Sequence, residues 1–216
     1  MTIKAICFDL DGTLLDTIED LAAAINAVLE QQQFPLRSPE ECQTYVGNGL
    51  NMLIERALPE NARTPDMVMA CVNAFHNEYE TRLNVHSRLY DGMAEVLDEL
   101  TRQGIRLSIL SNKPHRYTKL CVQHYFSNWP FDPVYGQMDG VPSKPDPTLA
   151  LQIAKEQGLE PSNFLFVGDS GVDMTVGIAA GMQVIGVSWG YRPVADLEKA
   201  KPLAVINQPK ELLSFC

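Results

Sequence analysis

Hydrophobic positions along the chain fall into short runs that are separated by longer amphipathic segments. Strand-like apolar runs occur at five places, namely residues 3–8, 105–110, 164–167, 184–187 and 203–206. Helix-length segments lie between most of these runs. Because strands that alternate with helices usually pair in parallel within one sheet, the pattern predicts an α/β fold with a parallel sheet.

The interval between the first two runs is too long for a single crossover helix. It spans about a hundred residues, whereas a parallel crossover needs little more than one helix. Apolar residues at helical spacing predict helices near residues 18–29 and 50–58, and Thr64-Pro65-Asp66 is typical of the start of a third. We therefore expect an inserted all-helical cap at residues 16–87, with linkers at its two ends. The core would comprise residues 1–15 and 88–216.

Composition and charge limit the classes of function. Of 216 residues, 45% are hydrophobic and 20% are charged, as in an ordinary globular protein. The net charge of -10 and the lack of a Lys/Arg stripe exclude a nucleic-acid partner. No apolar stretch has the length of a membrane span, and Asp9 and Asp11 interrupt the N-terminal run before it could form a signal-peptide core. The chain is therefore expected to be cytoplasmic, with no membrane partner.

Two carboxylates follow the first apolar run in the stretch ICFDLDGTLLDT, residues 6–17. Side chains two residues apart in an extended segment share a face, so Asp9 and Asp11 are expected to face together. Their spacing of roughly 6.6 Å along an ideal strand lets one attack a phosphorus atom while the other protonates the leaving oxygen. Gly12 permits a close turn, and Thr13 can offer its hydroxyl and N–H to an anion. Taken alone, the two acids could equally be turn residues, exposed surface residues or metal ligands with no catalytic role.

A second acidic strand end occurs in the stretch FLFVGDSGVD, residues 164–173. Asp169 follows the apolar run, and Asp173 comes one helical turn later. Because the carboxyl ends of parallel strands meet at one edge, Asp169 is expected to join Asp9 in a hard-cation site made of oxygen ligands. Asp173 is expected behind these ligands or near a catalytic lysine.

Two further segments carry polar residues that suit a phosphate group. Ser111 and Asn112 end the run GIRLSILSN and could donate to phosphate oxygens, although a helix cap would use the same residues. Lys144 precedes a proline in a predicted loop, so its position is more restricted than that of a lysine on a helix face. The four acids are Asp9, Asp11, Asp169 and Asp173. When all four are ionised, the acids carry a charge of -4, and Mg²⁺ together with Lys144 supplies +3. A phosphate dianion would therefore need both the metal and a protonated Asp11.

The segments DLDGT, SN, SKP and GDSGVD, in this order, resemble the haloacid dehalogenase superfamily of phosphohydrolases. The resemblance implies a Rossmann-like parallel-sheet core with an inserted all-helical cap. It also implies that Asp9 is a nucleophile that forms an aspartyl-phosphate and that Asp11 is the acid and base. Mg²⁺ would be held by Asp9, the backbone carbonyl of Asp11 and Asp169, while Ser111 and Lys144 would bind the phosphoryl group.

Longer segments, including YVGNGLNMLIERAL, SKPDPTLAL and IGVSWGYRP, look like phosphoglycolate phosphatases and their near relatives. The substrate implied is a small anionic phosphate ester. The loop Gly47-Asn48-Gly49 either begins a helix or faces the site, where its N–H groups could hold a second anionic group. Related pyrophosphatases, nucleotidases and sugar-phosphate phosphatases share much of the pattern. A catalytically silent binding or regulatory protein of the same fold is the alternative from another class.

Overall fold

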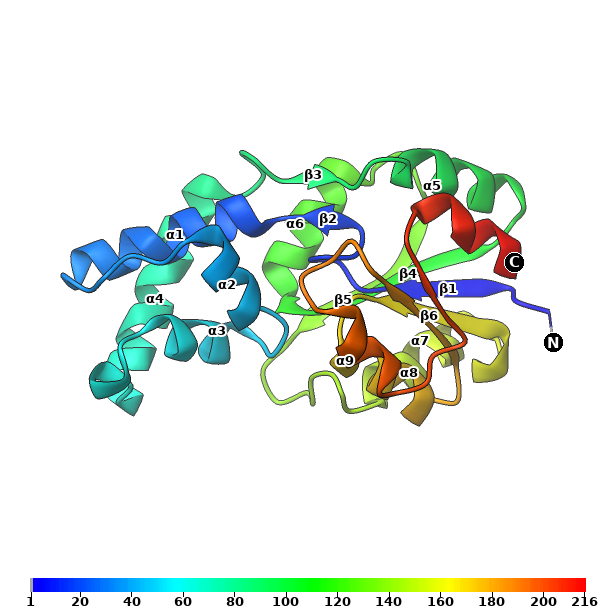
Figure 1. The fold of residues 1–216 in the computed structure, drawn as a ribbon. Coiled ribbons are helices and arrows are strands. Elements are labelled where there is room, and N and C mark those ends of the chain that lie inside the picture. Colours follow the sequence, from blue (N-terminus) through cyan, green and yellow to red (C-terminus); the bar gives the residue numbers. More distant parts are fainter. Residues whose placement is uncertain (1) are drawn as a thin grey trace.

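The computed structural model describes residues 2–216, and its core is a six-stranded parallel sheet (Figure 1). The strands of this sheet are β1 and β4 to β8, which span Ala5–Phe8, Arg106–Pro114, Phe131–Gln137, Phe164–Gly168, Gln183–Val187 and Ala204–Ile206. They lie in the order β5-β4-β1-β6-β7-β8. The central strand β1 pairs with β4 and β6, so Phe8 lies between Ile109 and Val167. The predicted α/β fold class is confirmed.

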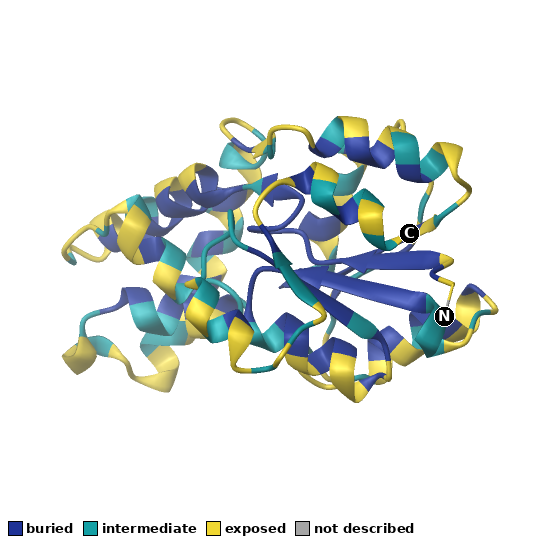
Figure 2. Ribbon diagram, turned by 45° about the vertical axis from the view of Figure 1, so that its right-hand side comes forward, coloured by how far each residue is buried: buried dark blue, intermediate teal, exposed yellow. Residues whose placement is uncertain are grey.

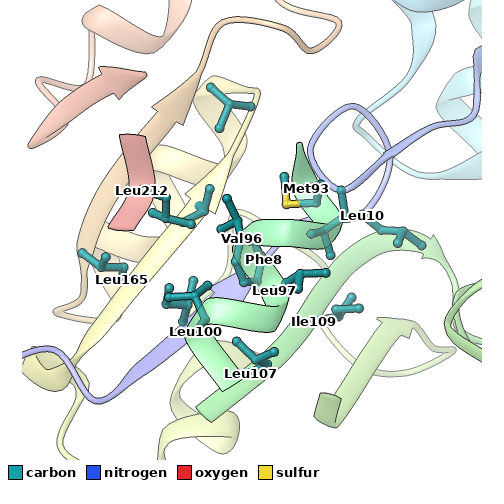
Figure 3. Close-up of a cluster of buried hydrophobic side chains, with 14 of the residues drawn as sticks. Phe8, Leu10, Met93, Val96, Leu97, Leu100, Leu107, Ile109, Leu165 and Leu212 are labelled. Carbon is teal, nitrogen blue, oxygen red and sulfur yellow. The ribbon is translucent and has the colours of Figure 1, made fainter. Parts of the chain in front are cut away.

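Helices cover both faces of the sheet and bury side chains that alternate along each strand. On β1, Ile6 and Phe8 join the hydrophobic cluster of one face, while Ala5 and Cys7 join that of the other. The first face packs against α5 (Met93–Arg102) and the 3-10 segment η3 (Pro209–Phe215), from which Figure 3 labels Met93, Leu97 and Leu212. It also packs against α6 (His115–Tyr125). The second packs against α7, α8 and α9, which span Thr148–Glu156, Gly171–Ala179 and Val194–Glu198. Figure 2 shows the strands buried between these layers, which leaves their carboxyl ends as the place for a site.

Four α-helices and the 3-10 helix η1 (Glu60–Ala62) follow β2 and precede β3, and the α-helices form a separate group beside the core (Figure 1). They are α1 to α4, which span Ile18–Gln31, Pro39–Tyr45, Leu50–Ala57 and Pro65–Arg82. Ile25, Ile54 and Phe75 belong to the hydrophobic cluster that these helices share. Thr64 begins α4 as predicted, because its hydroxyl accepts the N–H of Met67. No helix within residues 2–216 has both the length and the hydrophobicity to cross a lipid bilayer.

Two short strands connect these helices, called the cap below, to the core. Strand β2 (Leu15–Asp16) pairs antiparallel with β3 (Arg88–Leu89). Just beyond this pair, the carboxylate of Asp20 on α1 accepts hydrogen bonds from the backbone N–H groups of residues 85–87 and from the Ser87 hydroxyl, at 2.6 to 3.2 Å. The outgoing and returning segments are therefore joined twice, by strand pairing and by a buried carboxylate.

The helix α2 was missing from the sequence-based expectation. Ser38 begins it with a capping box, in which the Ser38 hydroxyl accepts the N–H of Glu41 and the Glu41 carboxylate accepts the N–H of Ser38. The stretch Ser-Pro-Glu-Glu at residues 38–41 is a sequence signal for such a start. The signal was present but short, because α2 has only seven residues.

The strands near the site also differ from expectation. Strand β5 was not predicted, and it contains Pro133, a residue that is unusual within a strand. The proline is tolerated because β5 lies at the edge of the sheet, where it removes no interior hydrogen bond. Strand β4 continues to Pro114 instead of ending near Leu110. It therefore carries Ser111, Asn112 and Lys113 in extended conformation to the edge where β1 ends.

Candidate active site

Strands β1, β4 and β6 end at the same edge of the sheet, which faces the cap helices (Figure 1). A cavity lies between this edge and the cap. Its polar lining includes Asp9, Asp11, Ser111, Asn112, Lys113 and Asp169, and its cap wall includes Leu21, Leu50, Leu53, Phe75 and Tyr79. The acids predicted from two separate strand ends are thus brought together.

Asp9 is buried at the centre of this edge and only 8% exposed. Its Oδ1 atom accepts the N–H of Leu10 at 2.7 Å and lies 2.9 Å from the Nζ atom of Lys144. Burial, and then the carboxylate of Asp173, raise the pKa of Asp9 to about 7 against the opposing effect of Lys144. A further cation beside Asp9 would favour its ionised form, which is the form that can act as a nucleophile.

Lys144 reaches the site from the loop that precedes α7. Its ammonium bridges Asp9 Oδ1 at 2.9 Å and Asp173 Oδ1 at 2.6 Å. Burial opposes the charge, but Asp173 and Asp9 outweigh it and raise the pKa of Lys144 above its ordinary value. Asp173 is itself fixed by a capping box with Ser170 at the start of α8. Asp173 therefore lies beside the lysine, which is one of the two places that the sequence suggested for it.

The buried carboxylates are compatible with a metal ion. Oxygens of Asp9, Asp169 and Asp173 lie within 4.8 Å of one another. Burial, then Asp173 and Asp9, raise the pKa of Asp169 well above its usual range, and no ion pair within residues 2–216 involves Asp169. Oxygen donors with uncompensated charge suit a hard divalent cation such as Mg²⁺. Lys144 and Ser170 already donate hydrogen bonds to the two oxygens of Asp173.

The carboxylate of Asp11 has a different set of partners. It accepts hydrogen bonds from Lys113 Nζ at 2.9 and 3.2 Å and from the Thr17 hydroxyl at 2.8 Å. Lys113 also donates to the Tyr79 hydroxyl of α4 at 2.7 Å. Sequence reasoning did not assign these partners to the site. The available signal was the position of Lys113, two residues after Ser111 in one strand and therefore on the same face.

Lys113 changes the charge balance expected from the sequence. Burial opposes its charge, but Asp11 and Tyr79 outweigh this effect and hold the pKa of Lys113 well above its ordinary value. With two lysines, a divalent metal ion would leave the four ionised acids neutralised. Binding of a phosphate dianion then does not require prior protonation of Asp11, in contrast to the charge count made with Lys144 alone.

Ser111 and Asn112 differ in what their side chains contact. Ser111 lines the cavity, and its Oγ atom accepts the N–H of Lys113 at 3.3 Å. The Asn112 amide donates to the carbonyls of Gly47 and Lys144 at 2.9 and 3.0 Å, and its Oδ1 accepts the N–H of Lys144 at 2.9 Å. Asn112 therefore joins the cap loop and the Lys144 loop to β4, and its polar side-chain atoms are engaged by backbone.

Thr13 is placed behind the site. It is fully buried, and its hydroxyl has no hydrogen-bond partner among residues 2–216. Its backbone carbonyl accepts the indole N–H of Trp189 at 3.1 Å. Thr13 is not among the residues that line the cavity, and its contact with an anion stays a prediction.

The predicted cap loop divides between the cavity and the outer surface. Gly47 and Gly49 line the cavity, whereas the Asn48 side chain accepts a hydrogen bond from Arg56 at 2.9 Å within the cap. Gly49 begins α3 with a φ of 85°, and a Cβ atom there would lie 2.6 Å from the Gln137 side chain. The loop is thus both a helix start and part of the cavity wall, which combines the two sequence interpretations.

The loop after β7 completes the site, although no residue of it was assigned from the sequence. The N–H of Tyr191 donates to Asp169 Oδ2 at 2.7 Å, and its hydroxyl accepts the N–H of Thr17 at 2.7 Å. A Cβ atom at Gly190 would lie 2.2 Å from the Asp169 side chain, so only glycine fits there. The Arg192 guanidinium donates to two backbone carbonyls at the end of α2.

The amino-acid sequence of this chain matches a known protein family. The haloacid dehalogenase-like hydrolase model matches residues 6–187. The phosphoglycolate phosphatase of Haemophilus influenzae is 34% identical over 98% of this chain and 97% of its own length. That of Pseudomonas putida is 32% identical over 99% of this chain and 79% of its own length.

The fold agrees with a solved relative. The crystal structure of a predicted phosphoglycolate phosphatase from Haemophilus somnus 129PT has a TM-score of 0.92 and 30% identity, with 99% of this chain and 98% of that chain covered. The matched range, residues 6–187, contains Asp9, Asp169, Lys113 and Lys144. The chain therefore belongs to the haloacid dehalogenase-like hydrolases.

Proposed function

We propose that the protein is a Mg²⁺-dependent phosphomonoester hydrolase that works through an aspartyl-phosphate on Asp9. The observation that carries this proposal is the convergence of Asp9, Asp11 and Asp169 on one cavity, with Lys144 in contact with Asp9. This set supplies a nucleophile, an acid and base, and a place for a hard cation. Membership of a hydrolase family supports the same reading.

The residues can divide the reaction into two steps. An oxygen of Asp9 attacks phosphorus, and the bond from phosphorus to the ester oxygen breaks as Asp11, which must enter this step protonated, gives that oxygen its proton. Water then loses a proton to Asp11 while its oxygen attacks the phosphorus, which releases phosphate and restores both acids. Lys144 and the Ser111 hydroxyl bind the phosphoryl oxygens. Held by Asp9, Asp169 and the Asp11 backbone carbonyl, Mg²⁺ would supply positive charge that offsets the charge of the phosphate.

For the substrate, we propose 2-phosphoglycolate or a similarly small phosphate ester. The two relatives compared above are phosphoglycolate phosphatases. The cap wall of the cavity is largely apolar, with Leu50, Leu53 and Phe75 among its residues. Such a wall offers few partners for the polar leaving groups of pyrophosphate, nucleotides or sugar phosphates, and an unpaired polar group is costly to bury. These three substrate classes are therefore the less favoured alternatives.

Phosphate release provides the test. We would measure kcat/KM for 2-phosphoglycolate, pyrophosphate, a nucleoside monophosphate and p-nitrophenyl phosphate, with Mg²⁺ and after chelation. We expect turnover with the metal only, and the highest value for 2-phosphoglycolate. Asp9→Asn should abolish turnover with the fold intact, and Asp139→Asn, at an exposed acid, is the matched control. Full activity after chelation or in Asp9→Asn would refute the mechanism, and ligand binding without hydrolysis of any ester would support the silent binding protein.

A further inference from the structure

Lys113 is a buried cation for which the two reaction steps above provide no role. Its side chain is 3% exposed, and it lines the cavity at the end of β4. The ammonium contacts two groups, the Asp11 carboxylate and the Tyr79 hydroxyl. An ammonium has three N–H donors. In the structure these donors point to Asp11 Oδ1, Asp11 Oδ2 and the Tyr79 hydroxyl, so an acceptor that enters the cavity would bind in place of the longest contact, the one with Asp11 Oδ2 at 3.2 Å.

Other cations near the cavity have other roles or partners. Lys144 bridges Asp9 and Asp173, and the proposed mechanism assigns it to the phosphoryl group. Arg192 lines the cavity, but its guanidinium donates to backbone carbonyls of the cap. Among the cavity-lining residues that the structure describes, Lys113 is thus the cation that directly contacts Asp11.

The contact between Lys113 and Asp11 places the ammonium on the leaving-group side of the reaction. Asp11 is the group that protonates the ester oxygen in the proposed mechanism, so the first atoms of the leaving group must lie next to its carboxylate. Lys113 Nζ is 2.9 Å from Asp11 Oδ1. A carboxylate attached to the first carbon after the ester oxygen would therefore come within reach of this ammonium. Beyond it, the wall formed by Leu50, Leu53 and Phe75 is apolar.

We propose that Lys113 is the specificity-determining residue of this site, and that it binds a carboxylate located one carbon from the ester oxygen of the substrate. This inference rests on the proposed phosphomonoesterase function and refines its substrate class to phosphate esters of 2-hydroxycarboxylates. Tyr79 is a positioning residue from the cap, because its hydroxyl holds the ammonium between α4 and Asp11. The carboxylate of the substrate, its second anionic group after the phosphate, is then recognised by the Lys113 side chain of the core. The amides of the Gly47–Gly49 loop are a separate candidate, which Gly47 variants test.

The first experiment changes the substrate and leaves the protein intact. We would compare kcat/KM of the wild type for 2-phosphoglycolate and for 2-phosphoglycolamide, which has nearly the same size but no carboxylate charge. A charge-assisted contact predicts about a ten- to hundredfold preference for the carboxylate. Equal values for the two esters would overturn the proposal even if both are hydrolysed. Failure to hydrolyse any ester would instead refute the underlying function.

The second experiment changes the residue. Lys113→Met should lower kcat/KM for both esters, because it also removes a partner of Asp11, but it should abolish most of the preference between them. Lys113→Arg should retain a preference, and Lys119→Met, at an exposed lysine of α6, should match the wild type. Tyr79→Phe keeps the charge and should reduce the preference only severalfold. An unchanged preference in Lys113→Met would refute the assignment and leave Lys113 as a partner of Asp11 alone.

A binding measurement separates recognition from turnover. In an Asp9→Asn background with Mg²⁺, calorimetry should show that Lys113→Met weakens binding of 2-phosphoglycolate about ten- to hundredfold and that of 2-phosphoglycolamide much less. Equal weakening of both ligands would contradict the proposal. If Lys113→Met does not fold, the comparison of the two esters with the wild type and with Lys113→Arg still decides the question.

Discussion

Replacing Asp20 by alanine should loosen the connection between cap and core, because its carboxylate gathers four donors from the returning linker. Asp20 is fully buried, and Ser87 is only 9% exposed. Without the carboxylate, the Ser87 N–H is left unpaired at a cost of about 2 kcal/mol, whereas the N–H groups of Val85 and His86 can turn to water and lose about 0.5 kcal/mol each. The sum over these three backbone donors is a loss of about 3 kcal/mol in the free energy of unfolding.

Asp20→Asn should cost less than Asp20→Ala. Three of the four donors meet one oxygen, Oδ2, and the amide oxygen can take that place. The amide nitrogen would then face the N–H of His86, which loses its acceptor. We expect a loss of about 1 kcal/mol for asparagine.

Urea unfolding, followed by circular dichroism and by the fluorescence of Trp129 and Trp189, measures these differences. Glu19→Ala is the matched control, since Glu19 is the exposed acid beside Asp20 on α1. For a chain of this length, a loss of about 3 kcal/mol also lowers Tm by roughly 6–12 °C. A loss below about 1 kcal/mol for Asp20→Ala, or an equal loss for Glu19→Ala, would refute the reasoning.

Three further predictions concern catalysis. Asp11→Asn should lower kcat/KM for 2-phosphoglycolate far more than for p-nitrophenyl phosphate, whose leaving group needs little protonation; a uniform loss would contradict the role of Asp11 as acid. Ca²⁺ should inhibit the Mg²⁺-supported reaction, because it takes more ligands at longer distances and would draw both oxygens of Asp9 to the metal. Steady-state rates would be measured with equal concentrations of Ca²⁺ and Mg²⁺, and rates equal to those without Ca²⁺ would argue against this prediction. Gly47→Val should raise KM for 2-phosphoglycolate more than for p-nitrophenyl phosphate if the loop contacts the substrate. The substitution should shift the loop, because Gly47 has a φ of 113° and its Cβ would lie 3.7 Å from Arg192. Equal changes in the two KM values would limit the loop to supporting the cap.

The sequence predicted those parts of the site that depend on local pattern and topology. Asp9 and Asp169 each follow an apolar run, and parallel pairing of the two strands places both at one edge. The interaction of Asp173 with a lysine was also among the expectations, because a residue one turn into a helix lies close to the preceding strand end. These inferences need only the period of a strand and the direction of its neighbours.

Contacts between cap and core could not be predicted in the same way. The pairing of Lys113 with Tyr79 depends on how α4 is oriented against β4, which no periodicity encodes. The hydrogen bond from the Thr17 N–H to the Tyr191 hydroxyl joins residues 174 positions apart. Such contacts follow from the tertiary arrangement, and they account for most of the site residues that were missed.

The central position of β1 has a consequence for synthesis on the ribosome. Of the six strands of this sheet, β1 is made first and pairs with residues 106–109 and 164–167, so its second neighbour is made about 160 residues later. At a translation rate of 5–20 residues per second, β1 would wait roughly 8–30 s for that partner. During this interval the cap helices, whose contacts are closer in sequence, can assemble first. The strand that leads to Asp9 is therefore made before both of its neighbours and is among the last strands of the sheet to be enclosed on both sides.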